Sequence, residues 1–194
     1  MVQFSSDWFD KLAKNNFESI IVPLYGNQSF KYLEIGTFEG ASIHYLLNNC
    51  PNCQAFVIDP FDNFNGTVNQ LETFKNNLKE HLHKITIIKG YSKKYLPTFE
   101  DNTFDCIYVD GDHTSYGALI DAFLSFPLLK TGGYMIFDDY VWIHNDSSHE
   151  IPDENDPRLL DKLNPFTGIN TFLSFYKDNV QIIKKNWQLI IKKI

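Results

Sequence analysis

"FDCIYVDGDHTSYGALIDAFLSFPLLKTGGYMIFDD", residues 104–139, contains two apolar runs that each end beside a pair of acids, with a helical pattern between them. The runs at 104–110 and 133–139 are short and near-continuously apolar, which indicates strands buried on both faces of a parallel sheet. The segment between them repeats apolar residues at helical spacing, as a crossover between parallel strands requires. The stretch therefore predicts a strand–helix–strand unit whose acids gather at one edge of a sheet.

The rest of the chain repeats this unit. We predict strands at 30–35, 54–59, 84–90, 104–110 and 133–139, with helices at 41–49, 67–82 and 115–129. A helical segment at 6–25 precedes them, and a helix at 169–179 and a hairpin of strands at 180–185 and 187–194 follow. Such alternation predicts an α/β fold with a doubly wound sheet and helices on both faces. In such sheets ligands bind outside the carboxyl ends of the strands.

Length and charge limit the class of protein. The 194 residues suit one domain, and we divide them into a helical cap at 1–28 and a domain at 29–194. The net charge is −7 and no basic stripe is visible, so we expect no nucleic-acid partner. No apolar run of about 18 residues is present and the start lacks a signal-peptide pattern, which predicts a cytoplasmic protein without a membrane partner.

The cysteines suggest no metal or redox site. Cys50 and Cys53 form a C-x-x-C pair, and Cys106 is the third cysteine of the chain. A zinc site with four thiolates needs a second pair, which the sequence lacks. We therefore predict structural roles for these thiols.

The loop after the first predicted strand indicates a ligand that carries positive charge. Gly36 and Gly40 lie there, with Glu34 just before them. The spacing is not the G-x-G-x-x-G that cradles a dinucleotide pyrophosphate, which argues against a nicotinamide-dependent reductase. An acid beside the turn attracts a cationic ligand, and Asp59, at the end of the second strand, is placed to accept the hydroxyls of a ribose. S-adenosylmethionine combines a ribose with a positively charged amino-acid tail.

The same residues carry a family resemblance. "YLEIGTFEGAS" (32–42) resembles motif I of class I S-adenosylmethionine-dependent methyltransferases, and "FVIDP" (56–60) resembles their second motif. The stretch 104–140 is similar to small-molecule O-methyltransferases that use a divalent metal. It is closest in pattern to the macrocin type, which methylates sugar hydroxyls. The terminal "NWQLIIKK" (186–193) is similar to the last strand of the broader family.

This resemblance implies a Rossmann-like fold and a cofactor site. The implied sheet has seven strands in the order 3-2-1-4-5-7-6 with strand 7 antiparallel, in three α/β/α layers, and 29–194 would be the methyltransferase domain. Caffeoyl- and catechol-type relatives end the fifth strand with Asp-Asn, whereas Asp-Asp here favours the sugar-type branch. The implied S-adenosylmethionine contacts are Glu34, Gly36, Thr37, Gly40, Ser42, Asp59, Gly90, Tyr91, Ser92 and Asp110.

The acids at the ends of the fourth and fifth strands predict a metal. Carboxylates packed together repel, by about 4 kcal/mol for two charges 4 Å apart at an effective dielectric of 20, and a cation turns that penalty into binding. Oxygen ligands favour Mg²⁺, Ca²⁺ or Mn²⁺, with Mg²⁺ our first choice. The resemblance assigns the ion to Asp110, Asp138 and Asp139. Because Asp138 and Asp139 are consecutive, both can face it only if the chain leaves extended geometry there.

The remaining assignments concern the acceptor and the base. The resemblance implies that Asp112, beside Asp110, removes the acceptor's proton; Asp112 as the N-cap of the following helix is the alternative. Three further residues are candidates for contacts to the acceptor: His113, Trp142 and His144. Loops as long as 141–168 are usually functional or disordered, so this segment is predicted to shape the acceptor side.

Together these features predict an S-adenosylmethionine- and metal-dependent O-methyltransferase of a small hydroxylated acceptor, with sugars and nucleotide sugars included. Two other functions stay open: a metal-independent small-molecule methyltransferase, and a catalytically silent cofactor-binding module that serves a partner protein. The resemblance also makes a homo-oligomer reasonable.

Overall fold

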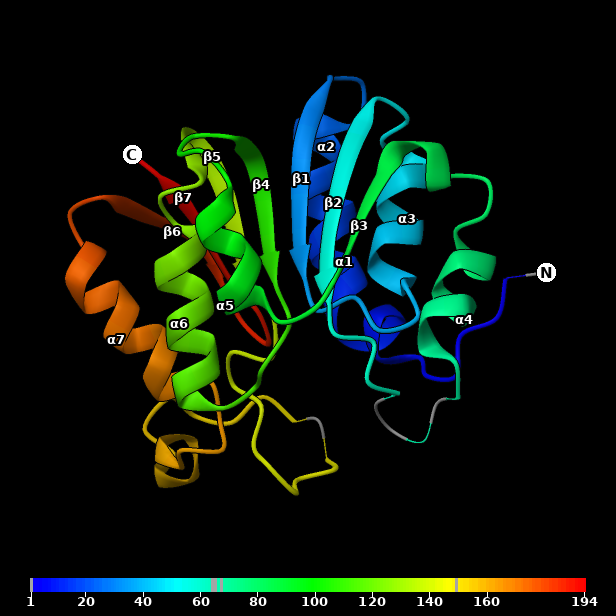
Figure 1. Cartoon of the computed structure of the whole chain (residues 1–194). Coiled ribbons are helices and arrows are strands. Elements are labelled where there is room, and N and C mark those ends of the chain that lie inside the picture. Colours follow the sequence, from blue (N-terminus) through cyan, green and yellow to red (C-terminus); the bar gives the residue numbers. More distant parts are fainter. Residues whose placement is uncertain (1, 64–65, 67, 149) are drawn as a thin grey trace.

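The computed structural model describes residues 2–63, 66, 68–148 and 150–194 and contains one seven-stranded sheet (Figure 1). The strand order is β3-β2-β1-β4-β5-β7-β6, with β1 to β5 parallel and β7 antiparallel to both of its neighbours. This confirms the predicted fold. The strands are β1 Phe30–Ile35, β2 Cys53–Asp59, β3 Ile85–Lys89, β4 Phe104–Val109, β5 Leu129–Phe137, β6 Val180–Lys185 and β7 Leu189–Lys193.

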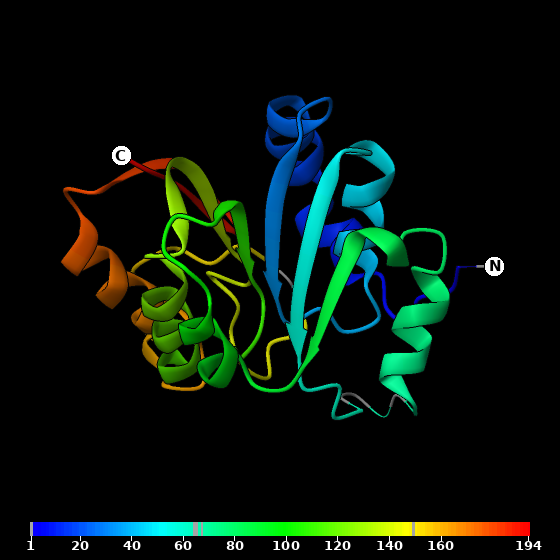
Figure 2. The same cartoon turned by 45° about the horizontal axis from the view of Figure 1, so that its top comes forward.

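Helices cover both faces of this sheet (Figure 2). The N-terminal segment forms continuous helical turns: a π-helical segment Phe9–Ala13, α1 Lys14–Asn16, a second π-helical segment Phe17–Ile21 and α2 Val22–Tyr25. The α-helices that follow are α3 Ala41–Asn49, α4 Gln70–Asn77, the short α5 Ser92–Tyr95, α6 Ser115–Ser125 and α7 Phe166–Tyr176. Short 3₁₀ turns lie at Leu82–Lys84, Leu96–Thr98 and Pro157–Leu160. None of the described helices has the length and apolarity needed to cross a lipid bilayer.

The core divides into two clusters because side chains alternate along each strand. On β1, Tyr32 belongs to the cluster beneath the N-terminal turns, α3 and α4, whereas Leu33 belongs to the cluster beneath α6 and α7. Tyr108 on β4 and Ile136 on β5 lie on the same face as Tyr32. The three layers therefore follow from central strands that bury side chains on both faces, and the first face brings the N-terminal turns against β4 and β5.

Several element boundaries differ from the prediction: the fifth strand begins at Leu129 and not at 133, and the last helix begins at Phe166 and not at 169. The helix predicted at 115–129 ends at Ser125, because Leu129 already pairs with Phe104 as the first residue of β5. The helix predicted from 67 begins at Gln70, and Thr67 lies outside the described residues. The short α5 was not predicted, since four residues are too few for a periodic pattern.

Candidate functional site

The first loop of the candidate site, after β1, is shaped by close packing against β4. Gly36 has φ +79°, and a Cβ placed on it would lie 2.0 Å from the carbonyl oxygen of Asp110. Gly40 has φ +86°, and its Cβ would lie 2.6 Å from the side chain of Leu78. Both conformations favour glycine. Gly36 and Gly40, which predict a ligand-binding loop, are therefore also required for the packing of this loop against Asp110 and Leu78.

Asp59 ties the loop after β1 to the loop after β2. Its Oδ2 accepts the backbone N–H of Thr37 at 2.8 Å and of Phe38 at 3.1 Å, and its Oδ1 accepts the N–H of Phe61 at 2.6 Å. Burial raises the pKa of Asp59, and these three bonds act against that rise. A carboxylate offers about four acceptor positions, so a ribose would have to share these oxygens with the backbone. The ribose role of Asp59 stays a prediction.

Glu34 is completely buried beneath the first loop. It accepts hydrogen bonds from the hydroxyls of Tyr32 and Ser42, both at 2.8 Å. Burial raises the pKa of Glu34 to about 7, against the effect of these bonds. The nearby hydroxyl of Thr37 also favours the charged form of Glu34. Its geometry does not meet the criteria for a hydrogen bond, and among the described residues this buried Oγ1 has no hydrogen-bond partner. An unpaired buried hydroxyl in a predicted cofactor loop is available to a ligand.

Tyr91 and Ser92 follow β3, where the N–H of Gly90 donates to the carbonyl of Asp59 at 2.9 Å and α5 begins. The Tyr91 hydroxyl donates to Asp62 Oδ2 at 2.8 Å, and the Ser92 hydroxyl donates to Asp121 Oδ1 at 2.5 Å. Asp121 is buried on α6, and burial raises its pKa to about 6. Sequence reasoning missed Asp121, because one acid within an apolar helical pattern looks like an ordinary surface position. Gly90 has φ +148°, at the predicted loop position.

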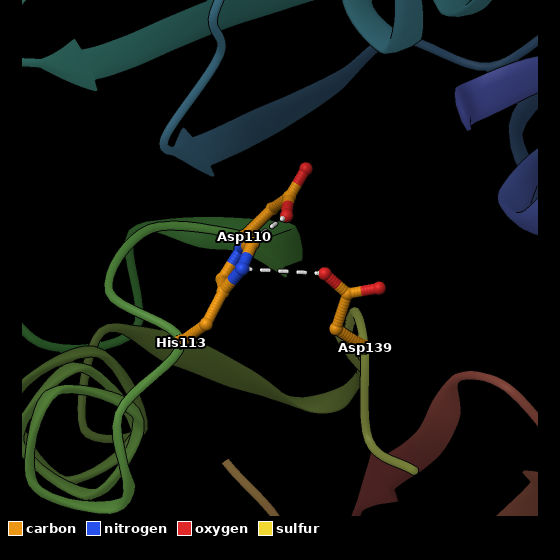
Figure 3. Close-up of side chains that lie close together, drawn as sticks. All are labelled: Asp110, His113 and Asp139. Carbon is orange, nitrogen blue, oxygen red and sulfur yellow. Dashed lines mark hydrogen bonds and ion pairs between the residues drawn. The ribbon is translucent and has the colours of Figure 1, made fainter. Parts of the chain in front are cut away.

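The acids after β4 and β5 meet around a histidine (Figure 3). His113 Nε2 lies 3.4 Å from Asp110 Oδ1, and His113 Nδ1 lies 3.4 Å from Asp139 Oδ2. Among the described residues these three offer potential ligand atoms that all lie within 4.8 Å of one another. Burial would lower the pKa of His113, but the bond to Asp110 and the nearby acids outweigh it and raise the pKa to about 9. Burial raises the pKa of Asp110 well above its usual value, and the nearby charge of Asp138 raises it further.

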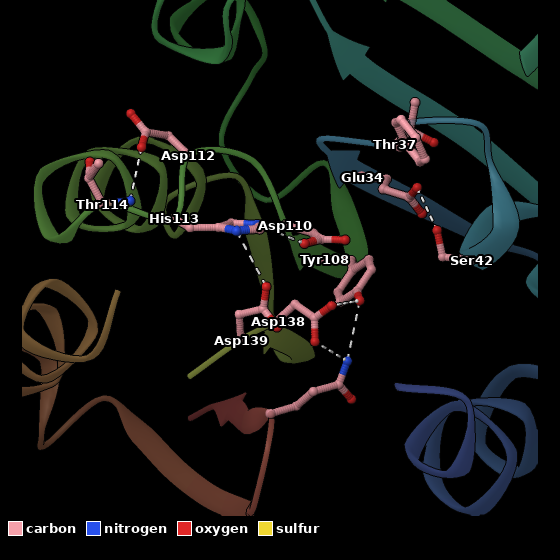
Figure 4. A network of polar contacts seen from close by, with 12 residues as sticks. Glu34, Thr37, Ser42, Tyr108, Asp110, Asp112, His113, Thr114, Asp138 and Asp139 are labelled. Carbon is pink, nitrogen blue, oxygen red and sulfur yellow. Dashed lines mark hydrogen bonds and ion pairs between the residues drawn. The ribbon is translucent and has the colours of Figure 1, made fainter. Parts of the chain in front are cut away.

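The consecutive acids Asp138 and Asp139 separate where β5 ends. Asp139 has φ +52°, a left-handed conformation, which confirms that the chain leaves extended geometry at this pair. Asp138 keeps the strand direction, and its oxygens accept hydrogen bonds from the Tyr108 hydroxyl at 2.6 Å and from Gln188 Nε2 at 2.8 Å (Figure 4). Asp138 is therefore beside the three-residue cluster without belonging to it, and its role as a metal ligand stays a prediction.

Asp112 points toward the start of α6 and away from the other acids (Figure 4). Its Oδ1 accepts the N–H of Thr114 at 2.9 Å, and a Cβ on Gly117 would lie 2.2 Å from its Cγ. Thr114, and not Asp112, is the N-cap, since its hydroxyl accepts the N–H of Gly117 at 3.0 Å. Asp112 thus packs against the helix start while His113 occupies the space between the acids.

The three residues predicted to contact an acceptor form one aromatic row. The ring of Trp142 lies 5.5 Å from that of His113 and 5.6 Å from that of His144, edge to face in both cases. The row begins at the acid cluster and runs into the loop 141–168. The structure therefore brings these residues together on the predicted side of the site.

Two functional candidates in the terminal hairpin escaped the sequence analysis. Trp187 Nε1 donates to Asp139 Oδ1 at 2.7 Å, and Gln188 donates to Asp138. The only sequence signal was a polar amide at the start of an otherwise apolar strand. Its significance depends on the register of β7 against β5, which the sequence does not show.

Comparisons with known proteins show the family of this chain. Residues 33–140, more than half of the chain, match a family model described as a methyltransferase domain. An uncharacterized protein of Acanthamoeba polyphaga mimivirus is 34% identical over 115 residues, which cover 56% of this chain and 51% of that protein. The Dictyostelium discoideum protein named "Probable caffeoyl-CoA O-methyltransferase 3" is 26% identical over 134 residues, 66% of this chain and 50% of that protein. The chain thus spans about half the length of these curated relatives.

A solved structure shows the same fold. The O-methyltransferase from Bacillus cereus in complex with SAH has a TM-score of 0.65 and 18% identity, covering 93% of this chain and 80% of that one. An identity this low supports the shared fold and carries no statement about the ligand or substrate of this chain.

The buried Glu34 predicts a pH dependence of stability. Its pKa is higher in the folded chain, about 7, than the usual 4.5, so its contribution is present below pH 4.5 and lost as the pH rises through 7. Glu34→Gln keeps the shape and cannot ionise. We expect the free energy of unfolding of the variant, relative to wild type, to rise by up to about 3 kcal/mol between pH 4.5 and 8. Urea denaturation at both pH values measures this, and parallel profiles would contradict it.

Proposed function

This chain belongs to the methyltransferase domain family, and from that premise we propose that it is an S-adenosylmethionine-dependent O-methyltransferase that uses a divalent cation. The acceptor is a small hydroxylated molecule of the sugar or nucleotide-sugar class. The observation that carries the proposal is the cluster of Asp110, His113 and Asp139 at the same sheet edge as the loop after β1. The loop after β1 and the acid cluster are in direct contact, because Gly36 packs against the backbone of Asp110.

The residues around the first loop fit the cofactor. The unpaired hydroxyl of Thr37 and the acid of Glu34 lie together beneath the loop, where the polar amino-acid tail would be held. Asp59 supplies oxygens on the ribose side, and the Tyr91–Ser92 loop borders the adenine side. When bound, the cofactor supplies an electrophilic methyl group on a sulfonium. Asp59 holds the loops after β1 and β2 together before any ligand arrives, which reduces the ordering that binding requires.

The acid cluster fits a hard divalent cation, with Mg²⁺ first. Asp110 and Asp139 offer oxygens, and each oxygen of Asp138 accepts one hydrogen bond and keeps a further acceptor position. When bound, the cation lowers the pKa of an acceptor hydroxyl and orients its oxygen. Asp138 and Asp139 would then bind the cation from two directions, because the left-handed backbone of Asp139 turns its own carboxylate toward His113.

The acceptor's proton needs a base near the acids. His113 lies 3.4 Å from both Asp110 and Asp139, so a hydroxyl bound beside these acids would be within reach of a ring nitrogen. The raised pKa of about 9 keeps the ring protonated at neutral pH, and a cation bound to the same acids would lower this pKa and free the nitrogen to accept the proton. Asp112, the base predicted from the sequence, has its carboxylate engaged at the start of α6. The geometry therefore supports His113 more than Asp112 for the proton transfer.

The aromatic row supports a ring-shaped acceptor. Trp142 of the loop 141–168 contacts His113 edge to face, and a sugar presents an apolar C–H face that an indole can cover while its hydroxyls meet polar groups. The Asp138–Asp139 pair supports the sugar-type branch, as in the family resemblance. The loop 141–168 would form the outer wall of this acceptor pocket.

Methyl transfer should depend on a divalent cation. We expect radiolabelled methyl transfer from S-adenosylmethionine to a pool of nucleotide sugars and sugars, its loss with EDTA, and its recovery with Mg²⁺ or Mn²⁺. Asp139→Ala should abolish the cation-dependent rate. Full transfer in EDTA would instead establish a metal-independent methyltransferase. Cofactor binding without transfer to any acceptor would indicate a silent module.

His113→Asn and Asp112→Asn separate the two candidate bases. With an acceptor from the same screen, we expect His113→Asn to lower kcat by at least about 100-fold, because a positioned base contributes that much. Asp112→Asn should retain most of the activity, since its carboxylate contacts the helix start. S-adenosylhomocysteine affinity, measured by calorimetry, should stay unchanged in both variants. The reverse order of kcat losses would assign the base to Asp112.

Asp59→Ala should weaken cofactor binding. Removing a carboxylate that organises two loops and accepts from the ribose should cost about 1.5–3 kcal/mol, or roughly 10- to 150-fold in affinity. Calorimetry with S-adenosylhomocysteine measures this, with Glu72→Ala on the exposed face of α4 as the matched control. Wild-type affinity in Asp59→Ala would remove the ribose assignment.

A further inference from the structure

The two acids that follow β5 accept hydrogen bonds from the two consecutive residues that precede β7. Trp187 Nε1 donates to Asp139 Oδ1 at 2.7 Å, and Gln188 Nε2 donates to Asp138 Oδ1 at 2.8 Å. Both donors are buried and uncharged, at 5% and 0% exposure. Each acid of the pair thus has its own donor from the terminal hairpin.

The sheet register sets the bond between Gln188 and Asp138. In the antiparallel pair of β5 and β7, Ile136 lies opposite Ile190 and Phe137 opposite Leu189. The next pair in this register is Asp138 and Gln188, whose side chains leave the sheet on one face, as directly opposed residues do. That face is the one beneath the N-terminal helical turns.

The N-terminal turns continue this chain of hydrogen bonds. Asn16 Nδ2 donates to Gln188 Oε1 at 2.7 Å and to Asn186 Oδ1 at 3.2 Å. An ionised carboxylate can only accept, so Gln188 must present its nitrogen to Asp138 and its oxygen to Asn16. The orientation of the Gln188 carboxamide is therefore determined from both sides. Asn16 is 1% exposed, so water does not substitute for either bond.

We propose that Gln188 and Trp187 are positioning residues for a divalent cation at the acid cluster, and that Asn16 positions Gln188. The inference rests on the cation dependence in the proposed function and extends it to residues of the hairpin and the N-terminal turns. Their N–H groups hold Asp138 and Asp139 from the outer side, so the remaining acceptor positions stay turned toward Asp110 and His113. Partners that orient metal ligands in this way typically change metal affinity by about 10- to 100-fold when removed.

Mn²⁺ binding to the full chain tests the two donors. Gln188→Met and Trp187→Phe delete the N–H groups and keep much of the side-chain volume, and Gln181→Met on the exposed part of β6 is the matched control. We expect each deletion to weaken Mn²⁺ binding by about 10-fold or more in an electron paramagnetic resonance titration. The control should bind Mn²⁺ like wild type. S-adenosylhomocysteine affinity should stay unchanged in all variants, which a general loss of structure would not allow. Wild-type Mn²⁺ affinity in Gln188→Met would overturn the proposal.

Asn16→Asp tests the role of Asn16. The introduced carboxylate cannot donate, so the Gln188 carboxamide turns over and presents its oxygen to Asp138. We expect Asn16→Asp alone to weaken Mn²⁺ binding, and the double variant with Gln188→Met to bind no more weakly than Gln188→Met alone. Additive losses would show that Asn16 does not act through Gln188.

The outcomes separate this inference from the proposed function. If the wild-type protein binds no Mn²⁺ and transfers methyl groups in EDTA, the proposed cation dependence is wrong, and this inference is wrong with it. A wild-type protein that binds Mn²⁺ with the same affinity as Gln188→Met and Trp187→Phe would overturn the positioning roles alone. Weaker binding in both donor variants, beside an unaffected Gln181→Met, is the result that supports them.

Discussion

The carboxylates at the ends of β4 and β5 repel one another, and much of the surrounding structure holds them in place. At an effective dielectric of 20, two charges 4 Å apart repel by about 4 kcal/mol. Uncharged donors reach Asp138 and Asp139 from Tyr108 and from the terminal hairpin, and His113 lies between Asp139 and Asp110. Burial and mutual repulsion raise the pKa of Asp110 and Asp138. A framework that fixes like charges at short range is suited to a positive ligand, because binding relieves the repulsion.

The cofactor side and the acid side of the edge are mechanically connected. Gly36 allows the loop after β1 to approach the backbone of Asp110, and Asp59 ties the same loop to the end of β2. A change at Gly36 would therefore displace both the predicted cofactor contacts and the first acid of the cluster. In a methyl transfer this connection has a clear use, because the methyl group and the acceptor oxygen must be aligned within a small tolerance.

Membership in the methyltransferase domain family does not identify the acceptor, since one fold serves many substrates. The loop 141–168, which is predicted to shape the acceptor side, is anchored by Asn164. Asn164 is completely buried; its side chain accepts the N–H of His144 and donates to the carbonyl of Arg158, and its carbonyl accepts the hydroxyl of Ser115 on α6. The described part of this polar segment is thus tied to α6 through Asn164 and contacts His113 through Trp142.

The sequence alone determined the strand–helix alternation, the gathering of the acids at one edge and the need for irregular backbone at Asp138–Asp139, because these follow from local periodicity and the geometry of parallel strands. The family resemblance supplied the strand order and the cofactor. Only the tertiary structure placed His113 between the acids, turned Asp112 onto α6 and brought Asn16, Trp187 and Gln188 to the site. These contacts join segments far apart in the chain through sheet register and helix packing, which no local pattern encodes.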